Sequence, residues 1–322
     1  MSNTQRIDWI DFAKVIAIFF VFLGHTDIQS SIMNRIYLFH MPLFFVISGF
    51  LWNENLNKEC IIIEFIKKKF RSLIIPYFKI ASVCLLIRGF VINFFLLDHD
   101  SYINALYKYF VGILLSIGNT EYMPSCSPIW FLTCLFFSEV ILCWIMKQRR
   151  SYYYIIICIA VTCVVLSSLK IPWSLGLSIR AIPFLYLGII LKRYSVLEKK
   201  QVLLSSGLIS VLAIYICDFE TNFATDSYFV IVYMLTTAPI ISIFILSCSR
   251  YISNLKLGGA KILNKYVGCE TLFLMGYNYL INPLAGTISF HIPIIQASVG
   301  ILILCIIKTC LNKYPMIKKC FI

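Results

Sequence analysis

Long apolar segments separated by short polar loops run through the whole chain. A transmembrane helix needs about 20 predominantly apolar residues, and ten segments come close to that length or reach it. They lie at 8–28, 34–53, 73–97, 128–146, 152–169, 174–191, 202–217, 228–248, 267–287 and 291–311. The pattern predicts an all-α, polytopic integral-membrane helical bundle of about ten transmembrane helices.

Composition supports the same class of protein. Hydrophobic residues make up 60% of the chain, charged residues 13%, and the mean hydropathy is +0.86. A compact soluble core of 322 residues could not hide that much apolar surface. The composition therefore excludes an ordinary soluble domain.

The basic residues predict the orientation of the helices. With the N-terminus in the cytoplasm, most of the 28 lysines and arginines fall in inner loops, and only Arg35, Lys108 and Lys170 fall in outer ones. Both termini are then cytoplasmic. An additional span at 102–118 would invert every later loop, so we interpret 98–127 as an extracytoplasmic or interfacial segment.

No repeat or Pro/Gly/Ser linker divides the chain, so we expect a single domain over 1–322. The longest inner loop is predicted at 54–72. It carries a basic run made of Lys67, Lys68, Lys69 and Arg71. The run fits positive-inside topology, and it equally fits a docking patch for a phosphate-bearing cytoplasmic ligand or for anionic lipid headgroups.

Several other classes are disfavoured. The net charge of +13 is spread over short loops without one continuous basic face, which argues against nucleic-acid binding. The thirteen cysteines form no CxxC pair and no Cys/His cluster with zinc-like spacing, so no metal site is expected. No cleavable signal peptide is evident, and we expect the first span to remain as an anchor.

Four polar residues interrupt the first two apolar segments: Asp11, Lys14, His25 and His40. Lys14 and His25 are eleven positions apart, which at about 100° per residue returns almost to the same helix face, about 16 Å further along the axis. Asp11 lies one turn before Lys14. Ionisable groups in a membrane are costly and usually functional, so these residues are candidates for an outward-facing, hydrated site that His25 and His40 share.

Further ionisable groups fall inside later spans. Arg88 and Arg180 are predicted in the outer half of the membrane, and Glu139 near the middle of its helix. The two arginines could stabilise an oxyanion or hold an anionic acceptor, or they could simply pair with Glu139 or with backbone carbonyls. Trp130 lies near the outer boundary, where aromatic belts occur, and could also offer a platform to a sugar ring.

Particular motifs resemble the acyltransferase 3 family of integral-membrane acetylases, most closely its branch with fucose 4-O-acetylase-like members. They are Lys14-x10-His25, FHMPLFFVISGF (Phe39–Phe50), RSLIIPY (Arg71–Tyr77), SPIWFL (Ser127–Leu132), RAIPFLYLG (Arg180–Gly188) and VGCETLFLMGYN (Val267–Asn278). The resemblance covers almost the whole chain, and the first eighty residues are its most specific part.

The resemblance implies transfer of an acyl group, usually acetyl, from cytoplasmic acyl-CoA to a hydroxyl of a bacterial surface polysaccharide. Acetyl-CoA is then the donor substrate, and no bound cofactor is expected. The partners would be acyl-CoA, a lipid-linked or surface polysaccharide acceptor and the lipids of the cytoplasmic membrane. Lys14 and His25 match the family motif, whereas Asn278 stands where members commonly carry His, which leaves it a hydrogen-bonding role.

The chemistry suggests a role for each candidate. Imidazole is a suitable base near neutral pH, so His25 is the candidate that deprotonates the acceptor hydroxyl. His40 could bind substrate, or it could satisfy backbone groups freed by Pro42. A serine nucleophile at Ser48 is disfavoured, because small residues such as Ser48-Gly49 are typical of close helix packing and no GxSxG elbow exists.

A secondary transporter or flippase of polysaccharide precursors is the main alternative, since it could also use intramembrane Lys, His and Arg. The chain shows no matching pair of Gly/Pro-interrupted helices in two halves, and its polar residues gather in the first two spans. The acceptor sugar, the acyl group and the choice between a monomer and a homo-oligomer stay open at this stage.

Overall fold

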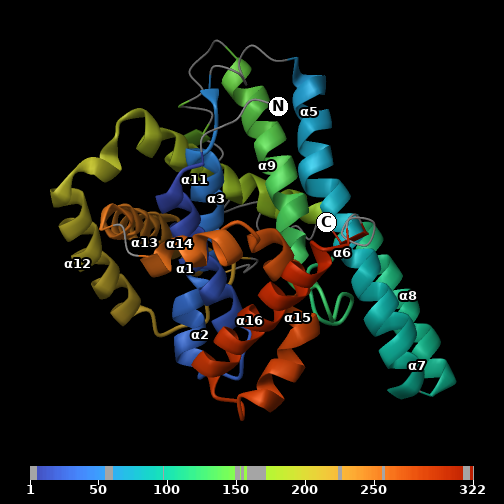
Figure 1. The fold of residues 1–322 in the computed structure, drawn as a ribbon. Helices are drawn as coiled ribbons and strands as arrows, with labels where there is room; N and C mark the ends of the chain where they lie inside the picture. Colours follow the sequence, from blue (N-terminus) through green and yellow to red (C-terminus); the bar gives the residue numbers. More distant parts are fainter. Residues whose placement is uncertain are drawn as a thin grey trace. The chain divides into compact units, whose positions relative to one another are not determined.

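The computed structural model describes residues 6–54, 61–96, 98–148, 153, 156–157, 172–223, 227–255, 258–314 and 320–321. In this part of the chain the secondary structure is helical throughout, without strands (Figure 1). The chain packs as two compact units, each assembled from segments that are distant in sequence. Because the units interleave along the chain, the prediction of one domain stays a prediction.

Unit 1 contains residues 1–24, 28–52 and 184–271. Its helices are α1 (Asp8–Leu23), α2 (Ser30–Tyr37), α3 (His40–Phe50), the second half of α11 (Leu175–Arg193), η5 (Val196–Glu198), α12 (Lys200–Ile216), α13 (Tyr228–Asn254), α14 (Gly258–Leu263) and η6 (Asn264–Gly268). Helix α1 packs against α3, α13 and η6, and α12 packs against α13. Its apolar residues Ala13, Ala17 and Ile18 are fully buried in this core.

Two glycines bring α3 and α11 of unit 1 into backbone contact. A Cβ atom at Gly49 would lie 1.8 Å from the carbonyl oxygen of Leu185, and one at Gly188 would lie 2.1 Å from that of Val46. Only glycine fits so close an approach between two helices. The sequence-based interpretation of Ser48-Gly49 as a packing position is therefore confirmed at Gly49.

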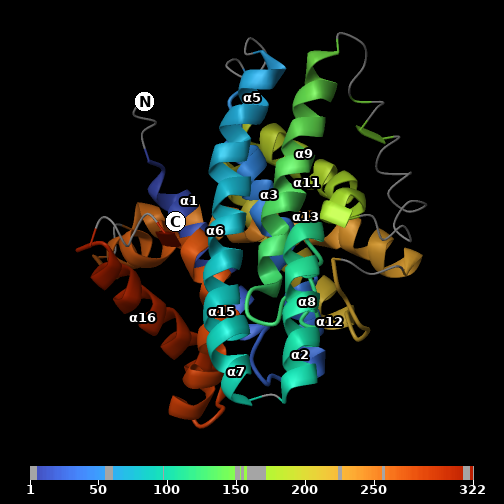
Figure 2. The same ribbon diagram turned by 90° about the vertical axis from the view of Figure 1, so that its right-hand side faces the viewer.

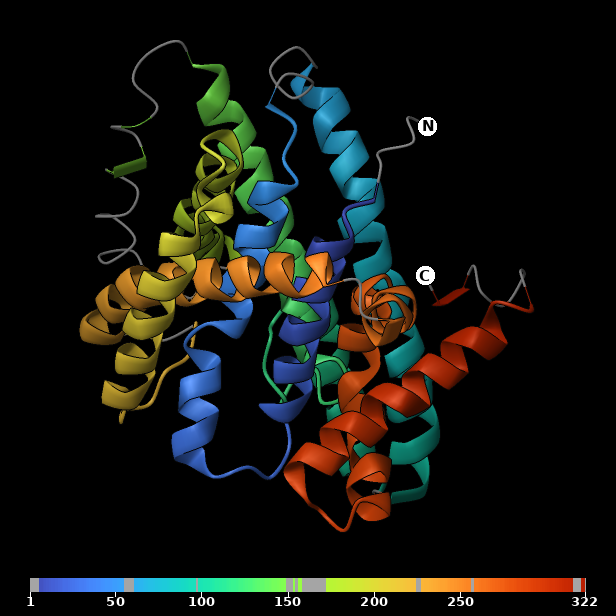
Figure 3. The same cartoon turned by 60° about the vertical axis from the view of Figure 1, so that its left-hand side comes forward.

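Unit 2 contains residues 25–27, 53–183 and 272–322. Its helices are α5 (Ile62–Lys69), η1 (Phe70–Ile74), α6 (Ile75–Cys84), η2 (Leu85–Ile92), α7 (Asn93–Leu96), α8 (His99–Leu115), η3 (Ser127–Ile129), α9 (Trp130–Lys147), η4 (Pro172–Ser174), the first half of α11, α15 (Thr271–Ile288) and α16 (Pro293–Leu311). Helices α5 and α9 run side by side (Figure 2). Helices α15 and α16 form a hairpin, coloured orange and red in Figure 3.

The segment from α5 to α7 is one helical rod, interrupted by two π-helical stretches, η1 and η2 (Figure 2). A π-helix widens the turn by one residue and is frequent at functional sites. In the predicted inner loop 54–72, residues 55–60 lie outside the described residues and those from 62 onward are helical, so a cytoplasmic loop at this point stays a prediction. The apolar residues Phe65 and Ile74 are buried, which explains why this strongly basic stretch folds as a helix.

Six helical segments are long and apolar enough to cross a membrane. They are Ser30–Phe50, Ile62–Leu96, Ser127–Lys147, Pro172–Arg193, Tyr228–Asn254 and Pro293–Leu311. They correspond to six of the ten predicted spans. Among the other four, α1 has 16 residues, α12 has 17 and α15 has 18, and 152–169 lies almost wholly outside the described residues. Ten spans with both termini inside therefore stay a prediction.

The predicted interfacial segment 98–127 forms α8 followed by an irregular stretch. Helix α8 is not one of the candidate spans. Asp98 caps its N-terminus by accepting a hydrogen bond from the backbone N–H of Ser101. Lys108 on α8 is paired with Glu121 at 2.7 Å, which raises the pKa of Lys108 and ties the helix to the irregular stretch.

Candidate functional site

Helix α1 ends before His25. Its last residue is Leu23, and Gly24 is the C-cap, whose carbonyl oxygen accepts a hydrogen bond of 2.9 Å from the hydroxyl of Tyr37. A Cβ atom at Gly24 would lie 2.8 Å from the Tyr37 ring. The expected helix face shared by Lys14 and His25 is therefore not formed, because His25 lies in the turn that follows the helix.

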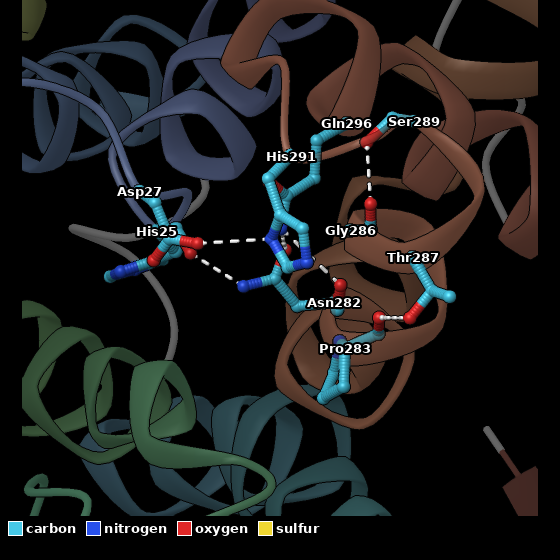
Figure 4. Close-up of polar contacts among 9 residues, drawn as sticks. All are labelled: His25, Asp27, Asn282, Pro283, Gly286, Thr287, Ser289, His291 and Gln296. Atoms are coloured by element: carbon cyan, nitrogen blue, oxygen red, sulfur yellow. Dashed lines mark hydrogen bonds and ion pairs between the residues drawn. The ribbon is translucent and has the colours of Figure 1, made fainter.

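His25 is held by residues of α15 within unit 2 (Figure 4). Its Nδ1 atom is 3.1 Å from the hydroxyl oxygen of Tyr279, and the two ring centroids are 4.8 Å apart. The side-chain amide of Asn282 donates a hydrogen bond of 2.5 Å to the backbone carbonyl of His25. Ring and backbone of this half-buried histidine are therefore both fixed by the same helix.

Asp27 provides a further link between the turn and the α15–α16 hairpin. Its carboxylate lies 3.2 Å from Nδ1 of His291, and both side chains are mostly exposed (Figure 4). His291 has a positive φ of 57° and follows Phe290, whose φ is 51°. This left-handed backbone lets the chain reverse between α15 and α16. An exposed pair of this kind adds little stability, and its effect is to locate the turn.

Three amide side chains lie on the same hairpin: those of Asn278 and Asn282 on α15 and that of Gln296 on α16. Gln296 of α16 donates a hydrogen bond of 2.9 Å from Nε2 to Oδ1 of Asn282. Asn278 lies one turn before Asn282 on α15 and is fully buried. Neither its Nδ2 nor its Oδ1 atom has a hydrogen-bond partner among the described residues. A buried amide without partners is uncommon in native proteins.

The contact with Tyr279 engages Nδ1 of His25, and the tautomer of the imidazole decides which nitrogen could act as a base. In neutral imidazole one nitrogen carries the proton and the other accepts. If Nδ1–H donates to the Tyr279 hydroxyl oxygen, Nε2 is the basic atom. The arrangement can thus support general-base chemistry at Nε2, with Tyr279 in the position of the group that orients the imidazole.

Asp11 and Lys14 form a second polar cluster, in unit 1. The Asp11 carboxylate is 4% exposed and pairs with Lys14 at 2.9 Å and with Arg6 at 2.8 Å. Gly268 of η6 packs on the backbone of Asp11, where a Cβ atom would lie 2.4 Å from the carbonyl oxygen. The expected Asp11–Lys14 pair is present, and Arg6 is a partner that the sequence analysis did not identify.

A third charged contact joins Lys69 of the basic run to Glu139 of α9. Lys69 was expected to face cytoplasmic phosphates, and Glu139 was assigned to the acceptor side. The structure places the Lys69 ammonium nitrogen 2.8 Å and 2.7 Å from the two carboxylate oxygens of Glu139. The other basic residues of this run, Lys67, Lys68 and Arg71, are exposed.

His40 occupies the break between α2 and α3. It is 6% exposed, and its Nδ1 atom donates to the carbonyl oxygen of Ile36 over 2.9 Å. This contact favours the structural alternative for His40, in which the imidazole satisfies a backbone group at a helix interruption. Whether His25 and His40 share one site stays a prediction.

The remaining candidates differ in exposure. Arg180 is 2% exposed, whereas Arg88 is half-buried. Trp130 packs on Gly118, at which a Cβ atom would lie 2.5 Å from the indole ring. Packing of Trp130 against a turn is a structural role that the sequence analysis did not anticipate.

Sequence reasoning missed the residues that hold His25: Asp27, Tyr279, Asn282, His291 and Gln296. A sequence signal was available for one of them, Asn282. Asn278 and Asn282 are four positions apart in an otherwise apolar segment, which places both amides on one helix face. The partners of Asp27 and Gln296 could be found only from the tertiary structure.

Comparison with known proteins identifies a family. A family model described as an acyltransferase domain matches residues 7–318. No curated protein and no solved structure matches the chain significantly. The match spans nearly the entire sequence. The described residues also include several apolar helices that are long enough to cross a membrane. The chain therefore belongs to the acyltransferase 3 family of membrane acyltransferases.

Proposed function

We propose that this protein is an O-acyltransferase of the bacterial cytoplasmic membrane. It moves an acetyl or related acyl group from cytoplasmic acyl-CoA to a hydroxyl of a surface-glycan sugar, in the manner of the fucose 4-O-acetylase-like branch. The observation that supports this most directly is the double fixation of His25, by Tyr279 at its ring and by Asn282 at its backbone. A base must be held in place before it can accelerate proton transfer.

The proposed reaction is a single displacement at the thioester. His25 takes the proton of the acceptor hydroxyl at Nε2 while the alcohol oxygen attacks the acyl carbon. The new C–O bond forms, the C–S bond breaks, and the proton passes from His25 to the departing thiolate. The products are the sugar ester and free coenzyme A. Tyr279 would hold the imidazole ring in position throughout.

Donor binding is proposed for the basic residues Lys14, Lys67, Lys68, Lys69 and Arg71. The ion pairs that two of these residues form indicate which of the five are best suited to bind the donor. Lys69 contacts both oxygens of Glu139, and Lys14 contacts Asp11, so much of the charge of these two lysines is already compensated. The exposed Lys67, Lys68 and Arg71 are better suited to phosphates of coenzyme A, with Arg able to bind them in two-pronged fashion.

Acceptor binding is proposed for Arg88, Arg180, Glu139, Trp130, Asn278 and Asp11, with His40 as a further contributor to the site. Arg180 and Arg88 would meet the anionic part of a lipid-linked acceptor. Glu139 would act through Lys69 and Asp11 through Lys14, because each carboxylate is engaged by that lysine. Lys14 and Asp11 would thus influence donor and acceptor together.

The test is transfer of radiolabelled acetyl from acetyl-CoA to glycan in membranes with matched expression of each variant. We expect label with wild type, a loss of at least about a hundredfold with His25→Ala, and a raised KM for acetyl-CoA with Lys14→Ala. The control is His99→Ala, because His99 is an exposed histidine paired only locally with Asp100.

Two results would reject the proposal. Unchanged transfer in His25→Ala would remove His25 from the chemistry. A wild-type protein that transfers no label, while export of the glycan depends on it, would favour the transporter or flippase interpretation.

A further inference from the structure

The hydrogen bonds around Asn282 have a fixed direction. The backbone carbonyl of His25 can only accept, so Asn282 must present its Nδ2 atom to it, at 2.5 Å. The Oδ1 atom of Asn282 then faces Gln296. Gln296 must in turn present Nε2, at 2.9 Å, because two oxygens would repel each other. The carbonyl of His25 therefore determines the orientation of both amides (Figure 4).

This direction leaves the Oε1 atom of Gln296 as an acceptor without a donor. Gln296 is 3% exposed, and Oε1 has no hydrogen-bond partner in the part of the chain that the structure describes. Gly286 provides the space that Gln296 occupies, since a Cβ atom there would lie 3.1 Å from Nε2. The side chain is thus closely confined, and its oxygen is buried.

Asn278 of α15 is a second buried amide of unit 2. It is 0% exposed, and its Oδ1 and Nδ2 atoms both lack partners among the described residues. At about 100° per residue, Asn278 and Asn282 are only about 40° apart around the axis of α15. Asn278 therefore lies on the helix stripe that carries the contact with His25, about 6 Å along the axis.

The chemistry of these atoms indicates what they could bind. Two acceptor oxygens, on Gln296 and Asn278, require a ligand that donates hydrogen bonds, and the Nδ2 atom of Asn278 requires one that accepts. A thioester and an ionised phosphate have acceptors only, so neither would satisfy both oxygens. A hydroxyl group donates and accepts at once, and a ligand with neighbouring hydroxyls could satisfy both amides.

We propose that Gln296 and Asn278 bind hydroxyl groups of the acceptor and thereby place one of them beside His25. This inference rests on the proposed acyl transfer; it adds Gln296 to the residues that contact the acceptor and names hydroxyl groups as the ligands of Gln296 and Asn278. The amides hold hydroxyls that do not react. The reacting hydroxyl gives its proton to His25 and its oxygen to the acyl carbon, and the thiol leaves with the proton.

The experiment uses Asn278→Leu and Gln296→Met, which keep side-chain size and remove the polar atoms. Asn104→Leu and Gln201→Met are the matched controls, because Asn104 and Gln201 are exposed. Thermal midpoints are measured on purified full-length protein in a sugar-free detergent without substrate. Transfer of labelled acetyl to glycan and the KM for acetyl-CoA are measured in membranes.

We expect Asn278→Leu to keep or raise the thermal midpoint, because the amide of Asn278 has no partner to lose. Gln296→Met also removes the hydrogen bond from Nε2 to Asn282, so a lower midpoint is expected for that variant. We expect each to lower transfer by about tenfold or more with the KM for acetyl-CoA unchanged, while the control variants behave as wild type.

The inference is overturned if Asn278→Leu lowers the midpoint by several degrees, since the amide then has a structural partner. It is equally overturned if wild type transfers label and both variants transfer it at the wild-type rate. A wild type that transfers no label is a different result, which rejects the proposed function itself.

Discussion

The ammonium nitrogen of Lys69 contacts both carboxylate oxygens of Glu139, at 2.8 Å and 2.7 Å, but the two side chains are unequally buried. Glu139 is 1% exposed and Lys69 is 24% exposed. Losing the lysine should therefore cost more than losing the glutamate. We expect Lys69→Met to destabilise the protein by about 3 kcal/mol, because a buried carboxylate loses its cation. Glu139→Leu should cost less, since a long lysine can move its ammonium group to solvent.

The double variant Lys69→Met/Glu139→Leu provides the control for this pair. It should be more stable than Lys69→Met alone, because the buried carboxylate of Glu139 is removed together with its lysine partner. Thermal midpoints of the purified variants measure all three. If Lys69→Met and Glu139→Leu lowered the thermal midpoint equally, the difference in burial between the two side chains would not determine how much stability each variant loses.

The close approach of α3 and α11 at Gly49 and Gly188 leads to a prediction about packing. An alanine at either position would place Cβ within 2.1 Å of a backbone oxygen, which a side-chain rotation cannot relieve. We expect Gly49→Ala or Gly188→Ala to cost at least about 3 kcal/mol by forcing α3 and α11 apart. Size-exclusion profiles and thermal midpoints provide the measurement. Gly259→Ala is the control, because nothing lies within 4 Å of its Cβ position. A Gly49→Ala variant with the thermal midpoint of wild type would contradict the close approach of α3 and α11.

Tyr279 should act on the rate and leave donor binding unchanged. Tyr279→Phe keeps the ring beside His25 and removes only the hydroxyl that contacts Nδ1. We expect kcat for acetyl transfer to fall about tenfold, with an unchanged KM for acetyl-CoA, because the imidazole loses its orienting partner. Tyr215→Phe is the control, since Tyr215 is 79% exposed. A rise in KM with an unchanged kcat would instead place Tyr279 at the donor.

The cap of α8 should respond to acid. The hydrogen bond with Ser101 lowers the pKa of Asp98, so the ionised form is the one that stabilises the helix. A lowered pKa means that this stabilisation is present above the ordinary pKa of an aspartate and is lost as the pH falls through the lowered value. The protection of the first turn of α8 against hydrogen exchange, measured relative to the intrinsic exchange rate at each pH, should therefore fall in acid. Asp98→Asn should keep the cap and abolish the pH dependence, and a pH response that persists in this variant would refute the assignment.

The helices were predictable because apolar segments of the right length leave few alternatives in a membrane. Their ends were harder to predict. The apolar pattern continues past Leu23, yet α1 stops there because Gly24 is the C-cap and its carbonyl binds Tyr37. The gap between two apolar segments at 54–72 gave no sign of a helix, whereas buried Phe65 and Ile74 show that the basic run at 67–71 has an apolar face and is helical.

The candidate site was predictable only where its partners are neighbours in sequence. Asp11 and Lys14 are three positions apart, and their ion pair follows from helix periodicity. The contact between His25 and Tyr279 joins residues 254 positions apart, and no local pattern indicates it. The direction of the amides at Asn282 and Gln296 likewise depends on a backbone carbonyl that only the tertiary structure brings near.

The π-helical stretch η1 begins at Phe70, immediately after Lys69. Such a stretch is equivalent to an α-helix with one inserted residue. Deleting one residue from it would restore a regular helix and turn everything before it by about 100° relative to α6. Lys69 would then face away from Glu139. The length of the chain at this point is therefore as much a part of the ion pair as the two charges, and a change in length without any change in charge should be enough to break it.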